Sequence, residues 1–594
     1  MAKRRRKVEN EAAEQERAES RPRESSETLR QWADFFWRHD WLILFVLAVV
    51  LKFGTWWATR ATDPYFDQVV DGFDQAAYHK WAITIVEGDW VGRSNKIFYN
   101  TPLYAYFVAI FYWIGGVQFE LTHFVQAWIG VGSVLLLYAV GRRFFARSVA
   151  LWGTLLFLFC RPVAFYEQQL LVEGPLILLH LGFLYCVARG METPRRLVWW
   201  ILAGIMFMLC AIGRGNILLF FPVVAVWILW YFKSESWPRR AGFAVAFVVS
   251  FFVAVSPVTL HNRLIGGKWV LTTNNGPILL FIGNTYDGQG MFGYPPSFRE
   301  VEKKYKGLGK PPDWGGEAIA NIKSHFGTWL GIMATKTYWF WNRYNVPSNA
   351  YLYKASEVTP FLRIFPVGYG LLFPFGLAGM IASWREWRKY SILYLYILAF
   401  ALSIIVIFVL GRYRLQALPV MALFTAYLLK QVAELWRGAR RGEAIALGVS
   451  AIALAGALYQ PPEIFTGESH ELISPREDNF YATGFFQRGE YDKALQQYRR
   501  AIEREPRYGP AYKGSAGAYL RQNRTQEAAL VLREGLRANP SDVDIARSLV
   551  DVDLAMGELE EARNLLEQLV RIYPQDQNLR GALQRVESAM GRQR

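Results

Sequence analysis

Charged and polar side chains gather in a few short stretches between long apolar runs. The first stretch, DGFDQAAYHKWA, contains Asp71, Asp74, Tyr78 and His79. Ionisable groups close to membrane depth are costly, so they are candidates for function by default. A carboxylate in such a place can act as a general base. This stretch is therefore the first place to look for a reaction centre.

Arginines recur in two short turns further along the chain, GRGN and GRYR. A guanidinium group makes paired hydrogen bonds to phosphate, so several arginines at one membrane face suit an anionic ligand. The predicted site combines three arginines for a phosphate, Arg214, Arg412 and Arg414, with polar residues for a pocket: Asp71, Tyr78, His79, Glu173 and His261.

The elements that must position these residues are membrane-spanning helices. A span needs roughly 20 mostly apolar residues, with a lower limit near 17. Eleven such runs begin near Trp41, Leu121, Val149, Leu171, Leu197, Ile217, Ala241, Leu362, Tyr390, Leu415 and Ala444. A shorter run, 101–115, follows Pro102 and is expected to lie at the interface without crossing.

Basic residues give the expected orientation. With the N-terminus inside, the five inner loops 141–147, 189–196, 233–240, 383–389 and 436–441 are all rich in Arg or Lys. This agrees with the positive-inside rule. The long segments 58–120 and 261–360, and the C-terminal part, then lie outside. Residues 1–35 read as a disordered, basic cytoplasmic tail, and no cleavable signal peptide is evident.

The composition supports a membrane protein and gives no sign of nucleic-acid binding. The chain has 594 residues, of which 53% are hydrophobic, and a net charge of +16. Residues 477–594 contain 18 basic and 18 acidic side chains, so the whole excess lies in the apolar part, where basic loops are expected. Cys160, Cys186 and Cys210 all lie in apolar runs and predict neither a disulfide nor a metal site.

The C-terminal part carries an internal repeat of 34 residues. Pro506, Pro540 and Pro574 share this spacing, as do Ala494, Ala528 and Ala562. The period is typical of tetratricopeptide repeats, which are paired helices. We expect three units and a capping helix over 575–591. The predicted fold is all-α: a polytopic bundle of about 11 spans over 36–460, a linker over 461–476, and a helical solenoid over 477–594.

The order of the motifs resembles that of membrane-embedded GT-C glycosyltransferases, such as the protein O-mannosyltransferases and the lipid A aminoarabinose transferases. Asp74, Tyr78 and Ala82 match a D-x-x-x-Y-x-x-x-A stretch in the first outer loop. Further matches are GDW (88–90), TPLY (101–104), Glu173, GRGN (213–216), NNG (274–276) with Gly283-Asn284, and RYRL (412–415). The resemblance covers residues 36–460. Gln416-Ala417 departs from it, since relatives often have Pro there.

The resemblance implies a sugar donor on a polyprenyl phosphate at the outer face of a bacterial inner membrane. It also implies Asp74 as base, with Arg214, Arg412 and Arg414 at the donor phosphate and Asn284 in the pocket. The acceptor is a protein or glycan hydroxyl, membrane lipid surrounds the bundle, and the repeats bind a protein partner. No cofactor is certain, and a divalent metal ion stays an open alternative.

Other roles remain open for several residues. Asp74 could cap the helix that starts there, Glu173 could pair with Arg214, and the late arginines could bind lipid headgroups. A transporter or flippase of lipid-linked glycans, or a membrane scaffold without activity, would also have spans and repeats. Transporters more often show related halves and broken helices at mid-membrane, and no such halves are seen here.

Overall fold

The computed structural model describes residues 39–192, 196–288, 290, 292–348, 350–459 and 473–593. The predicted tail over 1–35 and most of the predicted linker over 461–476 lie outside these residues. The chain divides into two compact units. The membrane unit comprises residues up to 57, 77–346 and 363–460; the repeat unit comprises 58–76, 347–362 and 461–594. The repeat unit thus includes two segments that the sequence analysis assigned to the outer loops of the bundle.

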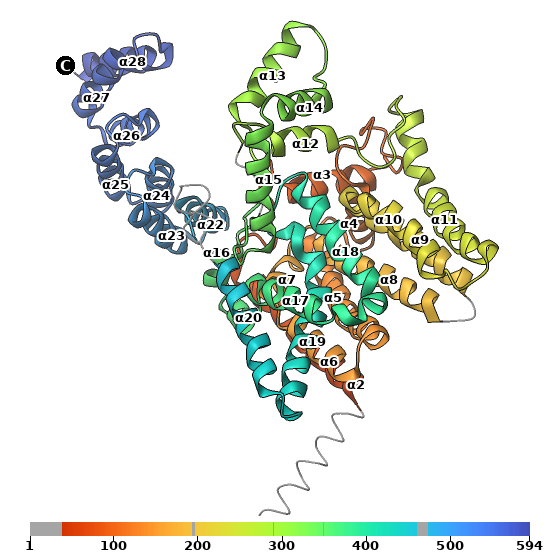
Figure 1. Cartoon of the computed structure of the whole chain (residues 1–594). Helices are drawn as coiled ribbons and strands as arrows, with labels where there is room; N and C mark the ends of the chain where they lie inside the picture. The colour runs from red at the N-terminus through yellow and green to blue at the C-terminus, as the bar shows by residue number, and fades with distance from the viewer. Residues whose placement is uncertain are drawn as a thin grey trace, which may run out of the picture. The chain divides into compact units, whose positions relative to one another are not determined.

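Eight helical segments of the described chain are long and apolar enough to cross a membrane (Figure 1). They are α2 (Asp40–Thr62), α5 (Phe119–Phe144), α8 (Glu173–Glu192), α9 (Arg196–Gly213), α11 (Trp237–Leu264), η3 with α18 (Trp384–Ile405), η4 with α19 (Arg412–Arg437) and α20 (Arg441–Tyr459).

Shorter apolar helices account for the other predicted runs. They are α4 (Pro102–Gly115), α6 (Arg147–Leu158), η1 with α10 (Gly215–Tyr231) and α17 (Tyr369–Ala382). All eleven predicted runs are therefore helical, but three of them are shorter than the usual span. The run that begins at Pro102 is also a short helix, as its length suggested.

The remaining helices of the membrane unit lie in the predicted outer segments, apart from the single short turn of α7 (Arg161–Tyr166). They are α3 (Asp74–Val86), α12 (Gly276–Asn284), α13 (Pro296–Gly307), α14 (Trp314–Ser324), α15 (Phe326–Trp341) and η2 (Pro360–Ile364). Two of them, α3 and η2, begin in the repeat unit. The only extended pairing among the described residues is an isolated bridge between Cys160 and Val367, so the chain is all-α as predicted.

Small residues let the spanning helices pack closely. A Cβ atom at Gly379 of α17 would lie 2.0 Å from the Phe424 carbonyl oxygen of α19, and one at Gly204 of α9 would lie 2.4 Å from the Phe247 carbonyl oxygen of α11. Small residues at such crossings are typical of membrane helices, because they maximise van der Waals contact between backbones. All three cysteines are buried and free, in agreement with their predicted role as small apolar residues.

A buried ion pair joins two elements of the bundle. Lys52 of α2 lies 2.5 Å from Glu167, which follows α7, and both side chains are 1% exposed. Gly130 of α5 leaves room for this pair, since a Cβ there would lie 2.9 Å from the Glu167 carboxylate. An unpaired charge inside lipid is costly, so each partner compensates the other.

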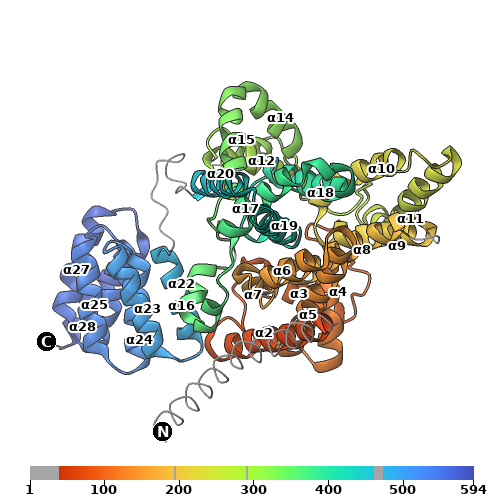
Figure 2. The same ribbon diagram turned by 60° about the horizontal axis from the view of Figure 1, so that its bottom comes forward.

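The repeat unit contains a row of antiparallel helices (Figure 2). The pairs are α22 (Pro475–Gln487) with α23 (Tyr491–Arg504), α24 (Gly509–Arg521) with α25 (Thr525–Ala538), and α26 (Val543–Met556) with α27 (Leu559–Ile572), followed by α28 (Gln577–Gln593). Ala494, Ala528 and Ala562 have no exposed surface, because each lies where the helices of a pair meet. Three units and a final helix are confirmed. The short α16 (Leu352–Val358) also belongs to this unit.

Candidate active site

Two arginines converge on one buried carboxylate in the membrane unit. Glu173 is the first residue of α8 and has no exposed surface. The Arg214 Nη2 atom lies 2.5 Å from Glu173 Oε1, and the Arg412 Nε atom lies 3.8 Å from the same oxygen. The sequence predicted all three residues for the site, and the fold brings them together from three separate segments.

Local structure explains how these side chains are presented. Arg214 lies in extended backbone, with φ −160° and ψ 113°, between the end of α9 and the short helix η1. Arg412 begins η4, directly before α19. Side chains at such helix junctions are held by the rigid helices on either side, although the junctions themselves have irregular backbone. The pairing of Glu173 with Arg214, one of the predicted alternatives, is what the structure contains.

Tyr413 completes this group, although sequence reasoning did not include it. The Arg214 guanidinium carbon lies 3.8 Å from the centre of the Tyr413 ring, and that of Arg412 lies 5.3 Å from it. A cation over an aromatic face is stabilised electrostatically, more so when water is excluded. The signal in the sequence was the position of Tyr413 between two arginines in the RYR turn.

The group carries an excess of positive charge. Two guanidinium groups face one carboxylate, and the Arg214 side chain is only 15% exposed. Within the described residues, the buried Nε and Nη1 atoms of Arg214 have no hydrogen-bond partner. Burying a charged donor without a partner is expensive, and charge-assisted bonds to phosphate are strong. The arrangement is therefore well suited to an anion.

Arg414 has a different environment from the one predicted. It has no exposed surface. Its guanidinium donates hydrogen bonds to four carbonyl oxygens, two in the last turn of α15 and two just after that helix: Trp339, Phe340, Asn342 and Tyr344. It also stacks 4.0 Å from the Tyr369 ring. These contacts use the guanidinium for chain packing, and the predicted role of Arg414 at a donor phosphate remains untested.

Asp74 begins α3 and is partly exposed, whereas Asp71 is exposed in the preceding turn. Both lie in the repeat unit. A carboxylate in the first turn of a helix interacts favourably with the helix dipole, and the capping alternative stays untested. The role of Asp74 as base stays a prediction.

Tyr78 and His79 of α3 are held by neighbouring polar side chains. The Tyr78 hydroxyl lies 3.3 Å from the Thr101 hydroxyl, and His79 Nδ1 lies 2.8 Å from the Tyr112 hydroxyl. Tyr78 also packs edge-on against the Tyr104 ring, with 5.0 Å between ring centres. The predicted pocket role of these two residues remains untested.

His261 and Asn284 have contacts that hold loops in place. His261 stacks on Phe98 with ring centres 4.0 Å apart, and its Nε2 atom lies 3.1 Å from the Gly92 carbonyl oxygen. Asn284 accepts hydrogen bonds from Trp329 and Lys336 and donates to two backbone carbonyl groups. These partners hold both residues in the fold, and the predicted pocket role of both remains untested.

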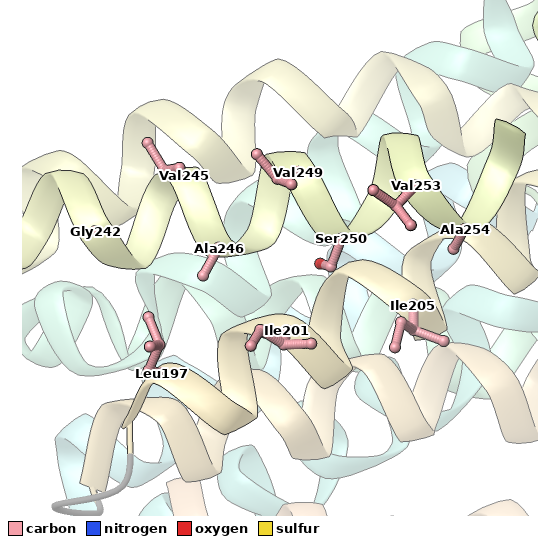
Figure 3. Close-up of a pocket in the computed structure, with 10 residues that line it drawn as sticks. All are labelled: Leu197, Ile201, Ile205, Gly242, Val245, Ala246, Val249, Ser250, Val253 and Ala254. Carbon is pink, nitrogen blue, oxygen red and sulfur yellow. The ribbon is translucent and has the colours of Figure 1, made fainter.

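An apolar groove runs along the first half of α9, between that helix and α11 (Figure 3). It has a volume of about 510 Å³ and is lined by Leu197, Ile201 and Ile205 of α9 and by seven residues of α11 from Gly242 to Ala254. Helix α9 ends at Gly213, directly before Arg214. At 1.5 Å per residue, Ile205 lies roughly 14 Å along the chain from Arg214.

No metal centre is indicated by the described side chains, since no group of three or more His, Cys, Asp or Glu residues lies close enough together to hold an ion. The metal ion considered in the sequence analysis is therefore assigned no site.

Comparisons with known proteins define the class of the chain. Residues 99–261 match the family described as dolichyl-phosphate-mannose-protein mannosyltransferase. Residues 482–543 and 520–586 match tetratricopeptide repeat families. Residues 99–261 are therefore similar to this mannosyltransferase family, and the C-terminal part is similar to tetratricopeptide repeats. No curated protein sequence matches the chain.

The solved structures that match the chain include the following two. The apo oligosaccharyltransferase of Archaeoglobus fulgidus is 14% identical, with a TM-score of 0.43; the match covers 78% of this chain and 60% of the archaeal one. ArnT from Cupriavidus metallidurans bound to undecaprenyl phosphate is 14% identical, with a TM-score of 0.40; the match covers 83% of this chain and 80% of the other. The chain thus spans about 60% of the length of the archaeal enzyme.

Proposed function

We propose that this chain is an integral membrane glycosyltransferase that moves a sugar from a polyprenyl-phosphate donor to an acceptor hydroxyl group. The observation that carries the proposal is the convergence of Arg214 and Arg412 on Glu173, with the buried Nε and Nη1 atoms of Arg214 left without a hydrogen-bond partner among the described residues. The mannosyltransferase family match over 99–261 supports the same reaction class.

In the proposed reaction, Asp74 accepts the proton of the acceptor hydroxyl group. The hydroxyl oxygen then attacks the anomeric carbon, and the bond from that carbon to the phosphate oxygen breaks with inversion. The leaving polyprenyl phosphate gains negative charge as this bond breaks. Arg214 and Arg412 stabilise the growing charge, which is the usual way in which fixed cations lower such a barrier. Glu173 keeps both guanidinium groups in place.

The apolar groove beside α9 is the candidate for the hydrocarbon chain of the donor. Apart from Ser250, the residues that line it are apolar, which suits an isoprenoid chain. Because α9 continues from the groove to the residue before Arg214, one extended lipid could contact both. The orientation that the basic loops predict puts the N-terminus in the cytoplasm and the repeats outside the inner membrane.

The test is sugar transfer by the purified full-length protein from a synthetic polyprenyl-phosphate sugar to a hydroxyl acceptor. Release of polyprenyl phosphate together with a glycosylated acceptor supports the proposal. Movement of the intact donor across a liposome membrane without transfer would identify a flippase, and neither activity would leave a scaffold. A parallel reaction with a chelator reveals whether a divalent metal ion is needed.

A further inference from the structure

The repeat unit contains more than repeats. Residues 58–76 connect α2 to α3, and residues 347–362 follow α15, so both segments lie between membrane helices in the sequence. In the structure both pack with the first repeat pair, α22 and α23. This relationship joins parts of the chain that are more than 400 residues apart.

One aromatic side chain of the first repeat contacts both segments. The Phe480 ring of α22 stacks on Tyr65 with 4.2 Å between ring centres, and on Phe73 with 5.4 Å. It also meets Tyr351 edge-on at 5.0 Å. Aromatic pairs of this kind contribute beyond the area that they bury. Phe480 is therefore the centre of a four-ring cluster.

Hydrogen bonds fix the first of these segments, 58–76, along helix α22. The Tyr65 hydroxyl donates to the Phe480 carbonyl oxygen at 2.6 Å, and Gln68 donates to the Gly484 carbonyl oxygen at 3.2 Å. Arg488 donates to the Asp63 carbonyl oxygen at 3.2 Å. Since the acceptors on α22 are main-chain atoms, these bonds set the register of the segment along the helix.

A buried ionic group secures the second segment. Lys354 of α16 forms an ion pair with Asp478 of α22, and neither side chain is exposed. Asp478 also accepts a hydrogen bond from Arg504 at 2.7 Å, and Arg500 lies 3.0 Å from Glu357 of α16. A buried charge pair requires its partners to be in place, because either charge alone would be strongly destabilising.

Phe73, which stacks on Phe480, directly precedes Asp74, the first residue of α3. On the basis of the function proposed above, we propose that the first repeat pair is a working part of the transferase and that Phe480 is a positioning residue for Asp74. The ring contact holds the residue from which α3 begins, and so limits the directions that the Asp74 carboxylate can take.

This inference changes the expected role of the repeats. From the sequence alone, we expect the repeats to affect only transfer to a macromolecular acceptor or the binding of a partner protein. If the first pair positions Asp74, removal of residues 476–594 also lowers transfer to a small acceptor. Binding of a protein to the repeats would then be able to change the transfer rate through α22.

The experiment compares two phenylalanines on α22 in the full-length protein. Phe480→Ala removes the ring that contacts Tyr65, Phe73 and Tyr351. Phe486→Ala is the matched control, since its recorded ring contact is with Tyr491, inside the repeat pair. Phe480→Tyr keeps the ring and is the rescue variant. The readouts are kcat, KM, affinity for polyprenyl phosphate, and hydrogen–deuterium exchange over residues 58–76.

We expect Phe480→Ala to lower kcat about tenfold or more, because small displacements of a reacting group are costly, with donor affinity unchanged within about twofold. Exchange over 58–76 should rise in Phe480→Ala and not in Phe486→Ala, and Phe480→Tyr should restore both. Unchanged kcat, unchanged exchange, or an equal fall in donor affinity in Phe480→Ala would overturn the positioning role. Lack of transfer by the unmodified protein would instead overturn the proposed function, and with it this role.

Two glycines offer an independent comparison. A Cβ atom at Gly484 of α22 would lie 2.8 Å from the Tyr65 ring and 3.0 Å from Pro64, whereas one at Gly517 of α24 would meet its nearest atom at 3.7 Å, in Phe486. Both replacements by alanine favour a helix equally. We expect Gly484→Ala to reproduce Phe480→Ala and Gly517→Ala to behave as the unmodified protein. Equal kcat and exchange in the two alanine variants would contradict the inference.

Discussion

Arg214 and Glu173 form a buried ion pair with 2.5 Å between Nη2 and Oε1, while the other two nitrogen atoms of the same guanidinium, Nε and Nη1, have no hydrogen-bond partner among the described residues. The carboxylate thus orients the arginine without using all of its donors. Removing Glu173 would leave the buried Arg214 charge without its partner, and breaking a buried pair in this way costs about 3–5 kcal/mol. Arg412, at 3.8 Å from the same carboxylate, is the better position for a test of ligand binding.

Arg412→Ala should weaken the affinity for polyprenyl phosphate by roughly 10-fold or more, the usual worth of a charge-assisted hydrogen bond. Arg412→Lys should recover only part of this loss, because an ammonium group cannot form the paired bonds of a guanidinium. Titration of the purified protein with the lipid measures both. An affinity equal to that of the unmodified protein in Arg412→Ala would remove this residue from the phosphate site.

Arg414→Ala should act mainly on stability, although Arg414 is only two residues from Arg412 in the sequence. Its guanidinium donates to four carbonyl groups in 339–344, which the alanine would leave without these donors. Each buried acceptor left unsatisfied costs about 1–3 kcal/mol. We expect a lower Tm in Arg414→Ala than in Arg412→Ala by differential scanning fluorimetry. Normal thermal stability in Arg414→Ala would contradict the packing role.

Asp74→Asn preserves shape and removes basicity. We expect transfer to fall on the order of 100-fold or more, which is typical for loss of a general base, while expression and donor affinity are retained. Asp71→Asn is the control, since Asp71 is exposed in the turn before α3 and should have a smaller effect. Initial rates at saturating donor measure both variants, and near-normal turnover of Asp74→Asn would exclude Asp74 as the base.

Glu477 predicts how the stability of the repeat unit depends on pH. Burial, with the neighbouring Asp478 as a second cause, raises the pKa of Glu477 from its ordinary 4.5 to about 8. The folded state therefore favours the protonated acid. Its contribution to the free energy of unfolding is fully present below pH 4.5 and is lost as the pH rises through about 8.

Glu477→Gln should therefore be more stable than the unmodified protein at pH 9, and the two should differ least at acid pH. Glu503→Gln on α23 controls for the loss of one exposed carboxylate. Thermal unfolding of the full-length variants, measured from about pH 5 to about pH 9, gives this comparison. The same pH dependence in Glu477→Gln and in the unmodified protein would rule out Glu477 as its source.

Sidedness can be tested with single exposed cysteines, because the three natural cysteines are buried. We expect Ser588→Cys on α28 to react with a membrane-impermeant maleimide in spheroplasts, and Ser234→Cys between α10 and α11 to react only after lysis. Both serines are exposed. The reverse pattern of labelling would invert the orientation that the basic loops predict.

Local patterns in the sequence were enough to predict the membrane helices and the repeats, and to select three charged residues that the fold brings together. Spacings of 34 residues and apolar runs reflect how neighbouring residues lie on one helix, so they can be read without a fold. The order of charged turns indicated Glu173, Arg214 and Arg412 in the same way. The lengths of the shorter helices, such as α6 (Arg147–Leu158), were harder to predict from the sequence, because the ends of a helix depend on the elements around it.

Only the tertiary structure separated Arg412 from Arg414. Both residues are arginines of the short helix η4. Arg412 nevertheless faces a buried carboxylate, whereas Arg414 faces four carbonyl groups. The packing of 58–76 and 347–362 with the first repeat was likewise not predicted from the sequence. Contacts such as Phe73 with Phe480 join residues about 400 positions apart, and no local periodicity records which distant surfaces meet, since that depends on the shape and charge of both.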